Sequence, residues 1–226
     1  MVKKSRGTPR REDSLSREGI VDAAIEILDS SGEAGLTFRA LSERLATGPG
    51  ALYWHIADKS DLLSAACDAI VARALEAPLA AATPQATIGA IAGGLFDAID
   101  AHPWVGSTLT RVAGGATMVR IVERVGQQVA ALHVPHEKQW ATVSALLHFI
   151  VGVAGQNAAN AQVARAQGAD RSEFLEDMAT TWSQLDANDY PFARSVAAQM
   201  RAHDDRADFL AGVELILRGI AAPRGR

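Results

Sequence analysis

Apolar residues recur at helical spacing along most of this 226-residue chain, and this periodicity constrains the fold more than any other feature. In residues 20–28, apolar side chains stand at i, i+3, i+4, i+7 and i+8, the pattern of a helix with one buried face. The alternating pattern of a half-buried strand is scarce. We therefore expect an all-α fold, and a hydrophobic content of 48% is sufficient for a sizeable core.

Capping residues and helix breakers divide this pattern into helices. Ser16 is a good N-cap for the first helix, and Gly32 is a good end for it. Thr37 precedes a short helix in the same way, and Asp58 precedes a fourth helix at about 59–76. Breakers farther along the chain predict seven more helices, at about 84–101, 103–113, 115–132, 136–167, 171–185, 191–202 and 205–220.

Cysteine usage and hydropathy indicate the compartment. The single cysteine, Cys67, excludes an internal disulfide and fits a reducing environment. Its alanine-rich helical surroundings favour a buried, small hydrophobic role over redox sensing. The N-terminus has no apolar region typical of a signal peptide. The most apolar stretch, residues 141–155, is shorter than a membrane span. We expect a cytoplasmic protein without a membrane partner.

The net charge of −4 argues against a uniformly basic nucleic-acid binder, but the charge is unevenly distributed. Residues 1–11 contain five Lys or Arg residues and no acid, in a polar segment with Gly and Pro. This composition predicts a disordered basic arm over residues 1–15. Arms of this kind commonly contact phosphates, and a solubilising tail is the equally weighted alternative.

Two short helices separated by a three-residue turn follow the first helix. The first of them is FRALSERL at 38–45, the turn is Ala46-Thr47-Gly48, and the second helix lies within 49–57. This is the spacing of a helix-turn-helix, whose second helix presents its N-terminal residues to the major groove of DNA. Residues 49–57 contain no acid, and Leu52 and Ile56 at i, i+4 give that helix a side that can dock on the others.

The segment SREGIVDAAIEILDSSGEAGLTFRALSERLATGPGALYWHIADKSDLL resembles the DNA-binding domain of TetR-family transcriptional repressors, over about residues 16–63. The resemblance rests on LTxRxLxxxL, on xLYWHI and on the K-x-x-LL that opens the fourth helix. Two positions depart from the family pattern. Ala46 stands where the turn usually begins with glycine, and Gly48 stands where the third helix usually opens on a polar cap.

The resemblance implies two domains, a three-helix DNA-binding domain at 16–63 and a larger helical domain at 77–226, with the helix at about 59–76 linking them. The C-terminal domain of such proteins binds a small molecule and forms the dimer. The resemblance also implies the residues that contact DNA: Arg39, Thr47, Pro49, Gly50, Ala51, Tyr53, Trp54, His55 and Lys59.

Within that set, Arg39 is expected to reach a base or a phosphate, and Lys59 to clamp a phosphate. A half-buried core position is the alternative for Tyr53 and a weaker one for Trp54, because a large exposed indole usually has a partner. Gly50 at the tip carries no hydrogen-bonding group that reads a base. Selectivity should therefore depend on Arg39, Thr47, contacts with thymine methyl groups and DNA shape.

One stretch of the C-terminal domain, SALLHFIVGVAGQNAANAQ, combines small and polar residues on one helical face. The residues that share about a third of the helix circumference are His148, Phe149, Gly152, Gly155 and Gln156. The combination suits an apolar site with a few hydrogen bonds, although for each single residue we favour close helix packing. The candidate ligand contacts are His102, Trp104, Met118, Trp140, His148, Phe149, Gly152, Gln156, Asn160, Met178 and Trp182.

The same stretch resembles the helix of the tetracycline repressor in which a His and, eight residues later, a Glu reach the drug and its magnesium. Here the second position is Gln156, and the loop that holds a metal-ligating His in that branch reads Ser107-Thr108-Leu109. An amide and an aliphatic side chain are poor magnesium partners. We therefore expect no metal and no cofactor, and an effector that is mostly hydrophobic, aromatic or polyketide-like.

The last helix, DFLAGVELILRGI, has a wide apolar surface that includes Phe209, Val213, Ile216 and Ile220. A fully intramolecular core helix is one explanation of this pattern. A palindrome-reading dimer is the other, and the resemblance implies it. We expect a homodimer formed through the helices at about 136–167 and 205–220.

Together these features predict a homodimeric repressor that binds a palindromic DNA operator and is released by a small-molecule effector. A DNA-binding activator or architectural protein without a ligand is the first alternative. An all-α enzyme or small-molecule carrier is the second. The sequence contains no nucleophile–base pair, metal-spaced cluster or cofactor loop, so we expect no enzymatic activity.

Overall fold

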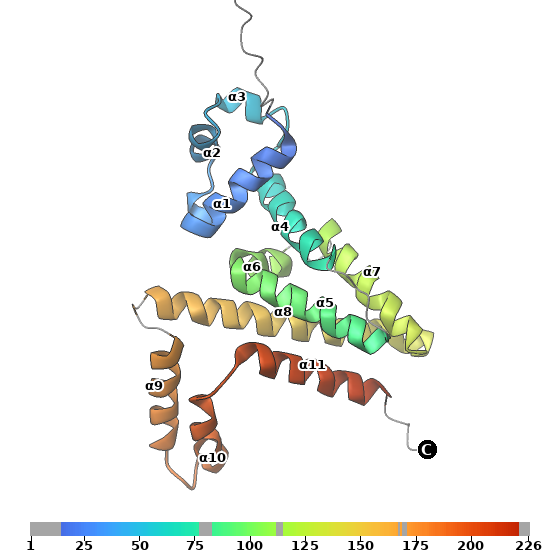
Figure 1. Ribbon diagram of the computed structural model, residues 1–226, viewed down its shortest axis with the longest axis vertical. Coiled ribbons are helices and arrows are strands. Elements are labelled where there is room, and N and C mark those ends of the chain that lie inside the picture. Colours follow the sequence, from blue (N-terminus) through green and yellow to red (C-terminus); the bar gives the residue numbers. More distant parts are fainter. Residues whose placement is uncertain (1–14, 77–82, 112–114, 167, 169–170, 222–226) are drawn as a thin grey trace, which may run out of the picture. The chain divides into compact units, whose positions relative to one another are not determined.

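The computed structural model describes residues 15–76, 83–111, 115–166, 168 and 171–221. Within these ranges all eleven elements are α-helices and no strand occurs, which confirms the predicted all-α fold (Figure 1). The chain divides into two compact units inside α4 (Lys59–Glu76), between Ala66 and Cys67. We refer to them as the N-terminal unit and the C-terminal unit.

The N-terminal unit contains α1 (Arg17–Gly35), α2 (Phe38–Arg44), α3 (Pro49–Leu52) and the start of α4. The predicted caps are confirmed. The Ser16 hydroxyl accepts a hydrogen bond from the backbone N–H of Gly19 at 3.1 Å, and the carboxylate of Asp58 accepts one from the N–H of Asp61 at 2.8 Å. Gly32 has φ 63° and ψ −172°, so the regular part of α1 ends at the predicted glycine and a further turn follows it.

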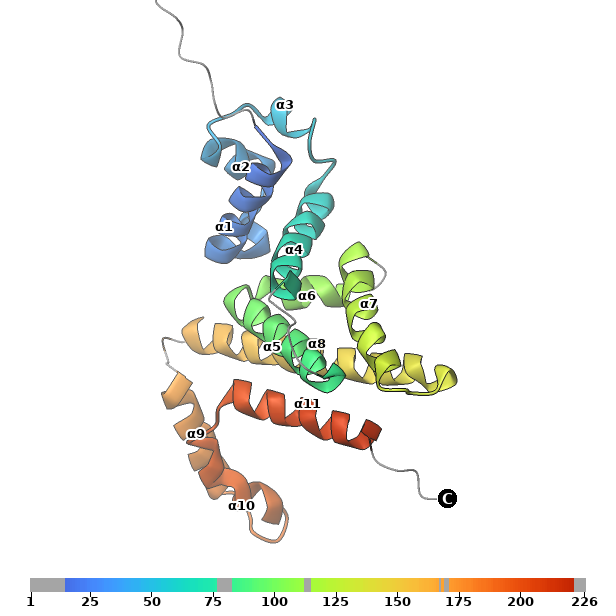
Figure 2. The ribbon, with the colours of Figure 1, turned by 45° about the vertical axis from the view of Figure 1, so that its right-hand side comes forward.

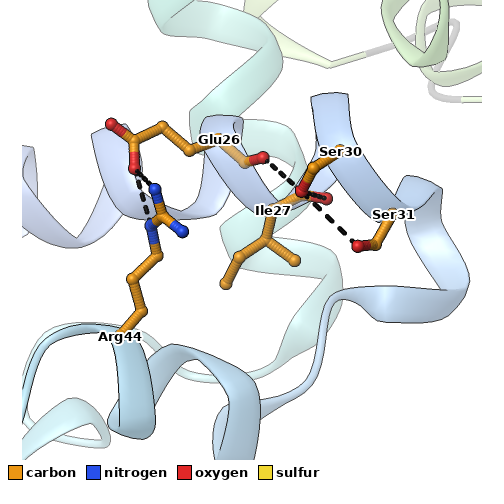
Figure 3. A network of polar contacts seen from close by, with 5 residues as sticks. All are labelled: Glu26, Ile27, Ser30, Ser31 and Arg44. Atoms are coloured by element: carbon orange, nitrogen blue, oxygen red, sulfur yellow. Dashed lines mark hydrogen bonds and ion pairs between the residues drawn. The ribbon is translucent and has the colours of Figure 1, made fainter.

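Apolar burial and ion pairs between helices hold this unit together. The fully buried side chains of the unit include Ile20, Leu28, Leu36, Leu41, Leu52, Ile56 and Leu62. On the surface, Arg44 of α2 pairs with the carboxylate of Glu26 in α1, with Nε 2.6 Å from Oε2 (Figure 3). The Ser30 hydroxyl donates to the backbone carbonyl of the same Glu26 at 2.8 Å. The Arg44–Glu26 pair joins α2 to α1, whereas the Ser30 hydrogen bond lies within α1.

The C-terminal unit contains the second half of α4 and seven further helices. These are α5 (Pro84–Ala101), α6 (Trp104–Arg111), α7 (Ala116–Ala131), α8 (His136–Ala166), α9 (Arg171–Ser183), α10 (Pro191–Met200) and α11 (Asp205–Ala221). Each corresponds to a predicted helix, with ends that differ by two residues or fewer. α5 and α11 lie along α8, and α9 and α10 form a hairpin at its C-terminal end (Figures 1 and 2).

The 31-residue helix α8 is the central element of this unit, because it packs against α5, α6, α7 and α11. Over His136–Ala164 it is long and apolar enough to cross a membrane by length and composition. A core helix of a soluble protein passes the same test. α8 packs against four helices of its own unit, and 39% of its most apolar segment is buried.

At two helix crossings in this unit, a glycine lies close to the backbone of the neighbouring helix. A Cβ atom on Gly94 of α5 would lie 2.9 Å from the backbone oxygen of Ala74 in α4. A Cβ atom on Gly106 of α6 would lie 3.2 Å from the Cα atom of Gly155 in α8. Glycine therefore sets the distance between α4 and α5 and between α6 and α8.

Cys67 is buried, with 1% of its surface exposed, which confirms the predicted role as a small hydrophobic residue. Burial, assisted by the negative charge of Asp68, raises the pKa of the thiol to about 12. Because the thiolate is the reactive form of cysteine, this thiol is inert at neutral pH.

Candidate nucleic-acid interface and ligand pocket

The turn between α2 and α3 has the geometry of a Schellman motif. The N–H of Thr47 donates to the carbonyl of Ser42 at 3.0 Å, and the N–H of Ala46 donates to the carbonyl of Glu43 at 3.3 Å. Ala46 takes a left-handed conformation, with φ 48°, at the position where glycine is usual. A side chain in this region costs about 1 kcal/mol. The departure from the family pattern therefore preserves the turn at a small cost in strain.

α3 is a single helical turn, Pro49–Leu52, and a further turn continues from it. The N–H groups of His55 and Ile56 donate to the carbonyl of Leu52 at 2.9 and 3.0 Å. Leu52 and Ile56 are buried, which confirms the predicted core side of this segment. Their burial directs the intervening residues outward.

The two rings between those anchors are both exposed. Tyr53 stacks on Phe38 of α2, with ring centroids 4.6 Å apart and planes at 9°, yet 59% of its surface stays exposed. The stack holds the segment after α3 against α2. Trp54 is 89% exposed. An indole exposed to this extent has the character of a surface that meets a partner.

Gly48 and Gly50, which form the tip of the N-terminal unit at the start of α3, are not needed for the fold of that unit. A Cβ atom on Gly48 or Gly50 would meet no atom within 4 Å. Gly48 has φ −82°, a conformation that any residue adopts. Pro49 and Gly50 are exposed. Neither packing nor backbone conformation requires small residues here, whereas close approach of an outside surface does.

Every Lys and Arg residue of the described N-terminal unit has a partner within the unit. The partners are Asp61 for Arg17, Glu43 for Arg39, Glu26 for Arg44 and the backbone carbonyl of Glu33 for Lys59. Residues 15–66 contain eight Asp or Glu residues against four Lys or Arg residues. Arg39 is 89% exposed in its pair with Glu43, and pairs this exposed are weak. Arg39 can therefore exchange its partner at little cost.

The remaining residues that the resemblance places at DNA lie on or beside the surface that carries Gly50 and Trp54. Thr47 and Ala51 are half-buried at the two sides of the tip. His55 is half-buried too, and its backbone carbonyl accepts a hydrogen bond from Arg17. The basic arm predicted at residues 1–15 lies outside the described residues up to residue 14.

In the C-terminal unit, a cavity of about 360 Å³ opens between α6, α7 and α8. Its lining is mainly apolar: Leu109, Thr110, Met118, Val122, Trp140, Ser144, Leu147, His148 and Val151. The Ser144 hydroxyl lies 3.3 Å from Nδ1 of His148, which places two polar groups at an otherwise apolar wall. The size and composition are those of a small-molecule site.

The cavity brings together three of the expected ligand residues, Met118, Trp140 and His148. The other eight do not line it. Trp104 is buried and meets His102 edge to face at 6.2 Å. Phe149 packs against Phe209 of α11 at 5.8 Å. The rest are exposed or half-buried on α8 and α9: Gly152, Gln156, Asn160, Met178 and Trp182.

Sequence reasoning missed much of the cavity wall, including Val122, Leu147 and Val151. On α8 the lining residues from Trp140 to Val151 follow helical spacing and so form one stripe. That stripe was a usable signal, but its apolar members have the same pattern as the neighbouring core.

The residues at the positions where the tetracycline repressor holds the drug and its magnesium have other roles here. The hydroxyls of Ser107 and Thr108 both donate to the carbonyl of Trp104 at 2.9 Å. Leu109 lines the cavity, and Gln156 is exposed. Across the part of the chain that the structure describes, no group of three or more His, Cys, Asp or Glu side chains is arranged to hold a metal ion.

α8 and α11 each leave an exposed stripe of mostly small or apolar residues. On α8 it comprises Ala141, Ala145, His148, Gly152, Gln156 and Ala159. On α11 it comprises Ala211, Leu215 and Gly219, with Leu215 68% exposed. Phe209 and Val213 of α11 are buried in the unit itself, and Ile216 and Ile220 are half-buried.

Comparison with known families gives two matches that together cover most of the chain. Residues 20–66 match the family described as bacterial regulatory proteins, tetR family. Residues 77–224 match the tetracyclin repressor-like C-terminal domain. The class D tetracycline repressor protein of Escherichia coli is 30% identical over 212 residues, which span 91% of this chain and 88% of that protein.

Solved structures agree with these matches. SCO7222, a TetR regulator from Streptomyces coelicolor, is 52% identical with a TM-score of 0.84, covering 92% of this chain and 98% of its own. BioQ with its double-stranded DNA operator is 25% identical with a TM-score of 0.63, covering 93% and 100%. ActR of Streptomyces coelicolor, in complex with actinorhodin, shares the fold at 21% identity and a TM-score of 0.74, covering 92% and 97%.

Proposed function

Because the chain belongs to the TetR family of ligand-responsive, DNA-binding transcriptional regulators, which are not enzymes, we propose that it is a repressor that binds a palindromic operator as a homodimer. A small, mostly hydrophobic effector releases it. The observation that carries this proposal is the surface that follows α2. Gly48 and Gly50 have open space where a Cβ atom would lie, and Trp54 is exposed, while Leu52 and Ile56 are buried beneath them.

We assign DNA reading to that surface and its margins. The assigned residues are Arg39, Thr47, Pro49, Gly50, Ala51, Tyr53, Trp54, His55 and Lys59. Because Arg39 is the more exposed of the two cations on α2, we assign it the reading of a base. Arg39→Ala then relaxes preference at one operator position, whereas equal weakening on every sequence would make Arg39 a phosphate contact.

The basic arm at residues 1–15 supplies phosphate contacts in this proposal. The folded part at 16–63 has an excess of acids and its cations are already paired, so it attracts DNA weakly by itself. Removal of residues 1–11 takes away five Lys or Arg residues. We expect a shallower salt dependence of DNA binding, since that slope follows the number of phosphates neutralised.

The C-terminal domain at 77–226 forms the dimer through α8 and α11. The exposed small and apolar residues of the two stripes support this assignment, because they allow close helix packing across a two-fold axis. Two N-terminal units related by this two-fold axis would contact half-sites about one turn of the DNA helix apart.

The cavity between α6, α7 and α8 is the effector site in this proposal. Its apolar lining favours an aromatic or polyketide-like molecule, with Ser144 and His148 orienting a polar group. The relative ActR binds actinorhodin. We propose no metal and no cofactor, since Leu109 and Gln156 stand where the tetracycline repressor resemblance would need metal or drug ligands. A cytoplasmic location fits the DNA partner.

Selection of bound fragments from the source genome tests the function. The expected result is a shared sequence with dyad symmetry, bound with an affinity that falls steeply as salt rises. A bound sequence without dyad symmetry contradicts the homodimer. Genes beside the bound fragments then suggest compounds, and a compound that fits the cavity should release the DNA. DNA binding that no such compound changes supports an activator or architectural protein instead.

A further inference from the structure

Residues 49–57, which carry most of the assigned DNA contacts, cannot hold their position by helix formation alone. α3 is a single turn of four residues, and a helix this short is not stable by itself in water. Burial of Leu52 and Ile56 holds the middle of the segment in the unit. The backbone of His55 and of Ala57 is held by a different kind of contact, with charged side chains of α1 and α4.

Arg17, the first residue of α1, makes the first of these contacts. Its Nη1 group donates to the backbone carbonyl of His55, and its Nη2 group donates to Oδ1 of Asp61 in α4 at 3.0 Å. The guanidinium group is planar and presents its donors in a rigid fork, so it can make both contacts at once. One side chain therefore joins α1, the end of residues 49–57 and α4.

Asp61 makes the second contact. Its Oδ2 atom accepts a hydrogen bond from the backbone N–H of Ala57 at 3.0 Å, while Oδ1 accepts the bond from Arg17. The N–H of Asp61 donates to the carboxylate of Asp58 at 2.8 Å, so the cap of α4 fixes the backbone of Asp61 in turn. One carbonyl and one N–H of residues 55–57 are thus each bound by a side chain of a neighbouring helix.

The Arg17–Asp61 pair is too exposed to add much to the stability of the unit. Its side chains are 49% and 33% exposed, and ion pairs this exposed contribute little. The Arg44–Glu26 pair is also exposed, at 48% and 58%, and it joins α2 to α1. The two pairs are similar in chemistry and differ in what they hold, because only Arg17–Asp61 binds the backbone that follows Trp54.

We propose that Arg17 and Asp61 are positioning residues for DNA reading. Together they fix the backbone of residues 55–57, and so the direction in which Trp54 and His55 project, without contacting a base themselves. When this backbone is loosened, attraction to phosphates remains, but the fit that distinguishes the operator from other DNA is lost. The assignment rests on the proposed repressor function and adds to it two residues that govern sequence discrimination.

Arg17→Lys tests the assignment without a change in charge, because a lysine ammonium lacks the fork that reaches both the His55 carbonyl and Asp61. In the full-length protein we expect operator affinity to fall about tenfold, or about 1.4 kcal/mol. Affinity for unrelated DNA and the slope of binding against salt should stay as in the unmodified protein. Arg44→Lys is the matched control and should change operator affinity by less than about twofold.

A direct phosphate contact by Arg17 gives a different result. Arg17→Gln then weakens binding to operator and to unrelated DNA alike, with a salt slope shallower by about one, while Arg17→Lys retains binding. That result overturns the positioning role. Unchanged operator affinity in Arg17→Lys overturns it too, and so does an equal loss on operator and on unrelated DNA.

Hydrogen exchange measures the same contacts without DNA. The amide of Ala57, which Asp61 binds, should exchange about threefold faster in Arg17→Lys and at an unchanged rate in Arg44→Lys. Equal rates in both variants would show that Arg17 does not fix this backbone. Asp61→Asn takes the place of Arg17→Lys if thermal unfolding shows that the latter is not folded, with the same expected loss of operator affinity. If the unmodified protein selects no operator, the repressor function fails, whereas the exchange rates fail only if the contacts do not hold the segment.

Discussion

In the N-terminal unit, Gly48 and Gly50 have open space where a Cβ atom would lie, whereas in the C-terminal unit Gly94 and Gly106 have neighbours at 2.9 and 3.2 Å from that position. Trp54 is 89% exposed, whereas in the C-terminal unit Trp104 is 5% exposed and Trp140, at the cavity, is 68% exposed. Internal packing therefore does not explain the glycines at positions 48 and 50, and contact with DNA is our proposed explanation. Glycine at positions 94 and 106 of the C-terminal unit reflects internal packing. Substitutions should separate these two explanations, because one predicts a change in the free energy of unfolding and the other a change in operator affinity.

The largest effect is expected at the α4–α5 crossing. Gly94→Ala forces a Cβ atom against the Ala74 carbonyl, and backbone cannot move aside as a side chain can. We expect a loss of about 2 kcal/mol in the free energy of unfolding, measured by denaturant titration.

The matched control is Gly89→Ala on the same helix, where a Cβ atom meets nothing within 4 Å. Alanine favours the helix there, so the free energy of unfolding should rise by about 0.5–1 kcal/mol. Equal effects of the two substitutions would remove the distinction between close-packed and open glycines.

The second effect concerns DNA and not stability. Gly50→Ala adds a methyl group to a surface that has open space in the free protein. We expect operator affinity to fall about tenfold, or about 1.4 kcal/mol, with no loss in thermal stability. If affinity is unchanged, Gly50 does not approach DNA closely, and the comparison between the units fails at the tip.

The third effect tests the one described residue of the N-terminal unit with a left-handed backbone and a side chain. Ala46→Gly removes the cost of φ 48° and should raise the free energy of unfolding by about 1 kcal/mol. Ala40→Gly, in the middle of α2, is the control and should lower it by about 1 kcal/mol. A destabilised Ala46→Gly variant would show that the turn relaxes around alanine.

The smallest effect is electrostatic. Hydrogen bonds from Arg17 and from the Ala57 amide hold the pKa of Asp61 below its usual value of 3.8. A lowered carboxyl pKa contributes stability that is complete above the unfolded pKa and is lost as pH falls through the folded pKa. Because the pair is partly exposed, Asp61→Asn should cost less than about 1 kcal/mol at pH 7. The free energies of unfolding of the unmodified protein and of Asp61→Asn should converge as pH falls below 3.8. A difference that stays constant with pH would contradict an electrostatic origin.

The helix boundaries were predictable because their signals are local. Ser16, Gly32, Thr37 and Asp58 act on atoms within a few residues, and each acts as the sequence indicates. The core side of residues 49–57 was predictable for the same reason, since Leu52 and Ile56 are one helical turn apart.

The cavity was only partly predictable because its walls come from three helices. Leu147 and Val151 line it, while their neighbours Leu146 and Ile150 belong to the core, and all four are buried apolar residues on α8. Periodicity assigns them to one apolar region without saying which helix opposes them. The sequence analysis predicted His148 as a ligand contact, but it did not predict how α6 and α7 pack around this residue.

The inert thiol of Cys67 has a practical consequence. At neutral pH maleimide reagents will not react with Cys67. A cysteine introduced on the surface can therefore be labelled selectively, without first replacing Cys67. A spin label at exposed Ser60, beside the assigned phosphate contact, would report the separation of the two subunits of the proposed dimer directly. The spacing on which the proposed operator recognition depends can in this way be measured by spectroscopy in solution.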